Sequence, residues 1–171
     1  MRYIQEVGDT EAYQYPAILR NYPLLSAFIA FAIAQSIKFF THRYKEKRWD
    51  AKQFIASGGM PSSHSATVTA LAAGVGIIEG FGSSNFSIAL ILASIVMYDA
   101  FGIRLHAGKQ AEVLNQIVYE LPEEHPLSDS KPLRELLGHT VPQVIAGCFL
   151  GVITAVCICL INRISGRTFD F

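Results

Sequence analysis

Residues 24–40 read LLSAFIAFAIAQSIKFF, an apolar run of about the minimum length that crosses a hydrocarbon core of roughly 30 Å. Three further runs follow it, at about 62–79, 86–105 and 141–161. Hydrophobic residues make up 51% of the 171-residue chain and charged residues only 16%, against roughly 25% charged in a soluble domain. We therefore predict an all-α, polytopic helical membrane bundle with about four transmembrane helices.

The chain is expected to form one membrane domain, residues 1–171, with a polar N-terminal segment at 1–22 that does not resemble a cleaved signal peptide. The run at 62–79 is small and hydroxylated, so it suits a helix buried among other helices. The stretch 106–139 contains AGKQAEVLNQIVYEL, which predicts an interfacial or re-entrant helix, and continues as a loop at 120–138.

Basic residues are distributed unevenly between the two ends of the predicted spans. The richer end is predicted to be cytosolic, or stromal or matrix in an organelle. A basic loop is expected from His42 to Lys52. The formal net charge is zero, which gives no reason to expect nucleic acid as a partner. Nine lysines and arginines fall at the richer end: Arg43, Lys45, Lys47, Arg48, Lys52, Arg104, Lys109, Lys131 and Arg134.

This topology predicts that polar residues from four helix ends converge at the basic face. The ends of the first and third spans and the starts of the second and fourth lie there. Such a set suits an anion-handling pocket. Its members are Lys38, His64, Asp99, Arg104 and His139.

The segment SGGMPSSHS, residues 57–65, reads as a loop that runs into a helix start. Unpaired N–H groups at such a start favour phosphate, and the hydroxyls of Ser62 and Ser63 can also donate. His64 could protonate a departing alkoxide. The alternative is that a serine simply caps the helix and His64 is an interface residue.

The blocks GGMPSSHSATVTAL, YDAFGIRLHAGKQAEVLN and LLGHTVPQVIAG resemble the divergent phosphatidic acid phosphatase type 2 family, related to vanadium-dependent haloperoxidases, and its plant members in particular. The likeness covers roughly residues 20–162. The wider superfamily uses three motifs, K-x6-R-P, P-S-G-H and S-R-x5-H-x3-D. The resemblance implies that basic groups hold phosphate, that the P-S-G-H histidine acts as an acid, and that the last histidine attacks phosphorus while the aspartate orients it.

Ser62 and His64 match the second motif, with Ser63 in place of its glycine, while Lys38 matches the first lysine and Arg104 the arginine of the third motif. The match is incomplete elsewhere. Lys45 stands where the first motif has arginine, and Gln110 and Leu114 stand where the third has its histidine and aspartate.

A glutamine amide cannot form the phosphoenzyme that histidine forms, so another nucleophile is needed. If the helix runs unbroken, Asp99, His106 and Gln110 share a face and Asp99 could orient His106. His139 is the second candidate. Water activated by His64 or Asp99 is the third. A structural Asp99–Arg104 pair is the alternative reading of that carboxylate.

The leading hypothesis is an integral membrane acid-phosphatase-like hydrolase that acts on a lipid phosphate or diphosphate at the cytosolic-type face. No metal or cofactor is expected, and vanadate is not expected because the motif set is incomplete. The expected catalytic residues are His64, His106, His139 and Asp99, and the expected phosphate-binding residues are Lys38, Arg48, Ser62, Ser63 and Arg104.

The rival hypothesis is a non-catalytic membrane protein that keeps the fold and binds lipid phosphate or a protein partner. A small transporter is disfavoured because the polar residues gather at one end of the spans. The bilayer and a membrane lipid phosphate or diphosphate are the expected partners, and homo-oligomerisation is left open. The organelle is also open, with the endoplasmic reticulum and the plastid as candidates.

Overall fold

The computed structural model describes residues 17–46, 59–135 and 137–165. A short 3-10 helix, η1 (Ala17–Arg20), precedes five α-helices in this part of the chain. These are α1 (Tyr22–Glu46), α2 (Ser63–Glu79), α3 (Ser84–Phe101), α4 (Ile103–Tyr119) and α5 (Val141–Ile164). The prediction of an all-α helical membrane bundle is confirmed.

Three helical stretches are long and apolar enough to cross a membrane: Tyr22–Thr41, Ser84–Tyr119 and Val141–Ile164. The fourth bundle helix, α2, has 17 residues, which gives it a length of about 25 Å. It is therefore shorter than the roughly 30 Å of a hydrocarbon core. The four predicted spans thus correspond to three long helices and one short helix held among them.

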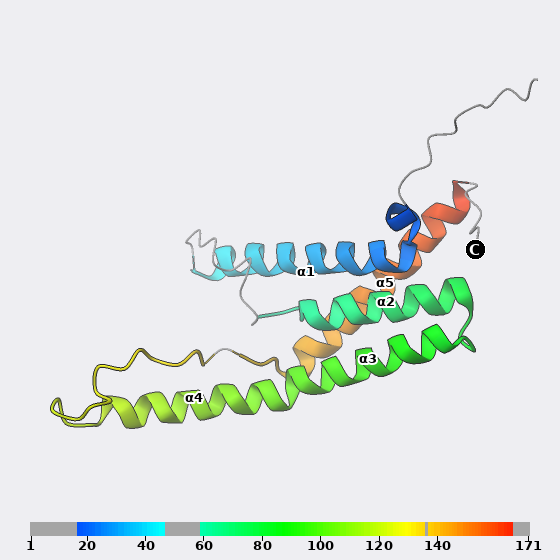
Figure 1. Cartoon of the computed structure of the whole chain (residues 1–171). Helices are drawn as coiled ribbons and strands as arrows, with labels where there is room; N and C mark the ends of the chain where they lie inside the picture. The colour runs from blue at the N-terminus through cyan, green and yellow to red at the C-terminus, as the bar shows by residue number, and fades with distance from the viewer. Residues whose placement is uncertain (1–16, 47–58, 136, 166–171) are drawn as a thin grey trace, which may run out of the picture.

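Helix α2 occupies the centre of the bundle and contacts α1, α3 and α5. Figure 1 shows α1, α2 and α3 side by side, with α5 crossing them obliquely. Small residues make this position possible because they let helix backbones approach closely. One buried alanine cluster joins α1 to α2, and it consists of Ala30, Ala34, Ala66 and Ala70. The prediction that this helix is buried among others is confirmed.

Local sequence signals fix where the helices begin. The side chain of Asn21 accepts from Leu24 N at 3.0 Å, Ser62 accepts from Ser65 N at 3.3 Å, and Ser83 accepts from Phe86 N at 3.1 Å. Each bond satisfies one N–H that the first turn of a helix leaves unpaired.

Helix α4 continues from α3 beyond the bundle, in nearly the same direction (Figure 1). Backbone hydrogen bonds pass through the junction, from Gly102 N to Tyr98 O at 2.8 Å and from His106 N to Gly102 O at 3.0 Å. A Cβ on Gly102 would lie 2.8 Å from Tyr98 O, so the close approach requires glycine. Of the described helices, α4 contacts only α3, and it extends away from the bundle rather than turning back into it.

The chain returns along α4. Asn115 donates to Leu133 O at 2.9 Å and accepts from Leu133 N at 2.8 Å. Gly108 lies so close to the returning segment of the chain that a Cβ on Gly108 would be 2.3 Å from Glu135 O. The described residues of 120–138 form no helix, and the segment is held against one face of α4.

Two predicted segments differ from the structure or lie outside it. Helix α1 continues to Glu46, so the start of the predicted basic loop 42–52 is helical. That helix is about 37 Å long, longer than the hydrocarbon core. Residues 47–52 of that loop, and residues 1–16 of the predicted N-terminal segment 1–22, lie outside the described residues.

Candidate functional site

The α1 end of the site is Lys38, whose side chain is buried although it carries an ammonium group. Lys38 is 6% exposed, and its Nζ donates to Ser63 Oγ at 3.0 Å. Its aliphatic stem passes Gly59, where a Cβ would lie 3.3 Å from Lys38 Cδ. The ammonium group of Lys38 therefore lies at the first turn of α2.

The first turn of α2 is fixed by its cap. Ser62 Oγ accepts from Ser65 N at 3.3 Å and from Ser65 Oγ at 3.0 Å, so the oxygen of Ser62 is engaged in capping. Ser62 N donates to Gln143 O at 3.0 Å and so ties α2 to the start of α5. The oxygen of Ser63 accepts from Lys38, which leaves its own hydroxyl hydrogen available to an anion.

His139 is held between α3 and α5 immediately before α5 begins. Its backbone N donates to Ala100 O at 2.9 Å, and its ring Nδ1 lies 3.3 Å from Gln143 Oε1. The side chain is buried, with 1% of its surface exposed, and among the described residues Nε2 has no hydrogen-bond partner.

The contacts of Gln143 determine which nitrogen of His139 carries the proton. Gln143 Oε1 accepts from the backbone N of Thr140 at 3.0 Å, which identifies the atom facing the ring as the amide oxygen. An oxygen accepts, so Nδ1 must donate, and the neutral ring then has its lone pair on Nε2. The buried, unpartnered atom therefore carries the lone pair of the ring.

His64 lies beside His139, with ring centroids 6.0 Å apart and ring planes inclined at 60°. Lys38, Arg104 and Asp99 are all near enough to His64 to act on its charge. Burial lowers the pKa of His139 below its usual value, and Lys38, His64 and Arg104 act in the same direction, while the hydrogen bond with Gln143 opposes them. The two imidazoles and two cations therefore form one electrostatic group.

Asp99 and Arg104 form an ion pair across the α3–α4 junction. The structural pairing considered from the sequence is therefore present. Gly138 packs against Arg104 and Leu105, where a Cβ would be 2.3 Å from Leu105 Cα. This contact places the chain against the start of α4 immediately before His139.

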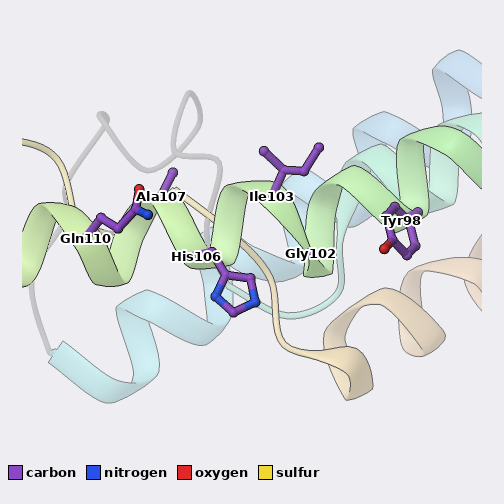
Figure 2. A pocket seen from close by; sticks show the side chains of 6 residues that line it. All are labelled: Tyr98, Gly102, Ile103, His106, Ala107 and Gln110. Atoms are coloured by element: carbon purple, nitrogen blue, oxygen red, sulfur yellow. The ribbon is translucent and has the colours of Figure 1, made fainter.

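His106 lies apart from this group. It is exposed and lines an open hollow of about 410 Å³ with Tyr98, Gly102, Ile103, Ala107 and Gln110. Figure 2 shows these residues along one side of the α3–α4 rod. Neither His64 nor Lys38 lines this hollow. Lys38, Asp99 and Arg104 lie near His64 and His139 instead, and we take these five residues as the candidate site.

Arg48, a predicted phosphate ligand, lies outside the described residues. Within the described ranges, no three His, Cys, Asp or Glu side chains are gathered closely enough to hold a metal ion.

Gln143 is the site residue that sequence reasoning missed. A signal was present, because His139 and Gln143 have the spacing of the H-x3-D part of the third superfamily motif, with an amide in place of the acid. The third motif places H-x3-D after the arginine that Arg104 matches, on α4, whereas the structure has a histidine and an amide at this spacing at the start of α5.

Comparison with known proteins gives a family match and a similar membrane protein. The model of the divergent PAP2 family matches residues 19–154, a range that includes Lys38, the 57–65 segment, Arg104 and His139. The "Uncharacterized membrane protein YuiD" of Bacillus subtilis (strain 168) is 40% identical over 146 residues, which cover 80% of this chain and 92% of that protein. No solved structure matches the chain.

Proposed function

The chain belongs to the divergent PAP2 family and is a membrane protein of that type, and on this premise we propose that it hydrolyses a lipid phosphate or diphosphate at the cytosolic-type membrane face. The observation that carries the proposal is the state of His139. Its Nδ1 is committed to Gln143 Oε1 at 3.3 Å, and its buried Nε2 has no partner in the described part of the chain. A phosphorus atom is an appropriate partner for that lone pair.

Phosphate binding is assigned to the groups that surround the two imidazoles. Lys38 Nζ and the Ser63 hydroxyl lie at the N-terminus of α2, where N–H groups and the helix dipole favour an anion. Arg104 supplies a second cation from the α3–α4 junction. These fixed positive groups would stabilise the charge that develops on the phosphoryl oxygens in the transition state.

The proposed reaction has two steps. His139 Nε2 attacks phosphorus, the bond from phosphorus to the lipid oxygen breaks with its electron pair on that oxygen, and His64 donates a proton where the leaving oxygen needs one. Water then attacks the phosphohistidine and gives a proton to His64. The P–N bond breaks, its electron pair returns to Nε2, and inorganic phosphate leaves.

The other routes considered from the sequence, attack by His106 and attack by water with Asp99 as the base, are less well supported. Asp99 is engaged with Arg104, and His106 faces an open hollow away from Lys38 and His64. His106 remains the alternative nucleophile that an experiment must exclude.

The test is phosphate release from lipid phosphates and diphosphates by the purified, detergent-solubilised protein in the presence of a chelator. His139→Ala should reduce release to background because it removes the nucleophile. His64→Ala should reduce it on monoesters by about 100-fold or more, the usual contribution of a general acid. Lys38→Met and Arg104→Gln should lower kcat/KM by weakening the stabilisation of charge.

His106→Ala distinguishes the two nucleophiles, and His125→Ala, an exposed histidine in the loop after α4, is the matched control. Both should keep near-wild-type release. Loss of release in His106→Ala with retention in His139→Ala would contradict the assignment of His139.

One observation favours the non-catalytic alternative, a protein that keeps the fold and binds lipid phosphate. His139 is 1% exposed, so a phosphate must displace a neighbouring side chain before it reaches Nε2. Under that alternative, the wild-type protein releases no phosphate from any lipid, yet inorganic phosphate or a lipid phosphate still raises its Tm.

A further inference from the structure

We infer that the site cleaves a lipid diphosphate in preference to a lipid monophosphate, an inference that rests on the function proposed above and narrows its substrate class. Three observations carry it: the neutral partner of His139, the positive charges near its ring, and what each kind of leaving group needs from the site.

The first observation is that an amide, rather than a carboxylate, orients the nucleophile. Gln143 Oε1 faces His139 Nδ1 at 3.3 Å and also accepts from Thr140 N at 3.0 Å. As Nε2 bonds to phosphorus, the ring acquires positive charge. A carboxylate would neutralise that charge, whereas an amide oxygen can only accept a hydrogen bond.

The second observation is that the charges near His139 oppose a positive ring. Lys38, His64 and Arg104 all act against protonation of His139, and the same repulsion acts on the ring as it becomes cationic. His139 is therefore a weak nucleophile, which requires a leaving group that departs readily.

The third observation concerns what a leaving group needs. A monoester releases an alkoxide, which must be protonated as it leaves. A diphosphate releases a phosphate monoester, whose charge needs cations rather than a proton. Lys38 Nζ donates to Ser63 in the first turn of α2, and Arg104, paired with Asp99, is near enough to His64 and His139 to act on their charge. In the proposed complex these two basic side chains stabilise the charge of the departing phosphate.

The reaction forms a P–N bond and then hydrolyses it. The Nε2 lone pair of His139 forms a bond to the terminal phosphorus, the bond from that phosphorus to the bridging oxygen breaks, and the electron pair remains on the bridging oxygen of the released lipid monophosphate. Water then cleaves the P–N bond, returns the pair to Nε2, and leaves as part of inorganic phosphate after losing a proton to His64 or solvent.

The experiment compares lipids that differ only in the headgroup. Each of two tails, a dialkylglycerol and a C15 polyprenyl alcohol, is presented to the wild-type protein as the monophosphate and as the diphosphate. Loss of the first phosphate is followed by mass spectrometry of the lipid product. The expected kcat/KM is at least about tenfold higher for the diphosphate, because the departing phosphate is stabilised by cations and needs no proton from His64. A ratio below about tenfold overturns the inference.

Gln143→Glu tests the cause of the preference. A carboxylate facing Nδ1 should stabilise the cationic ring, raise monophosphate turnover and reduce the ratio by tenfold or more. Gln116→Glu makes the same charge change at an exposed position on α4 and should leave the ratio unchanged. An equal ratio in both variants contradicts the role of Gln143, and if Gln143→Glu does not fold, the wild-type comparison decides the inference alone.

The two proposals fail in different ways. If neither headgroup loses phosphate, the proposed hydrolase function itself is wrong. If both lose it at similar rates, the hydrolase function stands and the preference for diphosphate is wrong.

Discussion

His139 connects three helices through contacts of different kinds. Its backbone N–H bonds to Ala100 at the end of α3, its ring bonds to Gln143 in the first turn of α5, and the ring lies 6.0 Å from that of His64 in α2. A buried imidazole with one committed nitrogen has a defined tautomer. The residue is therefore a packing element whose second ring nitrogen, Nε2, carries the lone pair.

The burial of His139 has a consequence for stability against pH. Its pKa is lowered in the folded state, so the unfolded chain binds a proton more readily, with a pKa near 6.5. Stability should therefore be constant above about pH 6.5 and be lost as the pH falls from there through the lower folded pKa.

The measurement is Tm in detergent between about pH 5 and pH 8, for the wild type and His139→Gln. The wild-type Tm should decline below about pH 6.5, and the variant should decline less steeply. Parallel curves would contradict the assignment of the titration to His139.

At the scale of elements, the contact between α2 and α5 depends on two glycines of α5. A Cβ on Gly147 would lie 2.3 Å from Ser62 O, and one on Gly151 would lie 2.1 Å from Thr69 Oγ1. Gly147 therefore lets the start of α5 approach the cap of α2. This contact brings His139 and His64, which are far apart in the sequence, to one end of the bundle.

Gly151→Ala should destabilise the protein because its Cβ would also lie 2.4 Å from Ala66 O, a backbone atom that cannot rotate away. Overpacking of this kind costs about 1–3 kcal/mol, which corresponds to a fall in Tm of about 2–12 °C. Gly82→Ala is the control, because a Cβ there meets nothing within 4 Å. Equal Tm values for the two variants would show that α2 and α5 are less closely packed than the structure has them.

At the scale of the whole molecule, the count of basic residues predicts that the candidate site faces the cytosolic-type side of the membrane. The loop after α4 lies at the same end of the molecule as that site, whereas the turn between α2 and α3 lies at the other end of the bundle (Figure 1). The positive-inside rule then predicts opposite compartments for these two connections.

Cysteine labelling tests this orientation. The native free thiols Cys148, Cys157 and Cys159 are replaced by alanine, and Asp129→Cys or Gly82→Cys is introduced. A membrane-impermeant maleimide should label Asp129→Cys only in inverted bacterial vesicles and Gly82→Cys only in right-side-out vesicles. Labelling of both from one side would contradict the count of spans, and the reversed pattern would contradict the orientation.

The sequence by itself determined the helices. Apolar run length, the serine cap before the second run, and the small residues of 62–79 act within a few residues of each other, so a linear reading can find them. Its charge distribution also predicted that Lys38, His64, Asp99, Arg104 and His139 would converge, and the structure brings these residues to one end of the bundle.

Only the tertiary structure decided which groups within that set lie together. Asp99 was available to either His106 or Arg104, and across the α3–α4 junction it pairs with Arg104. His106 lies apart from the site, and His139 lies beside His64. Helix packing and the return of 120–138 along α4 set how far each of these histidines is from the others. Such contacts join residues far apart in the chain, and no local pattern encodes the angle at which two helices meet.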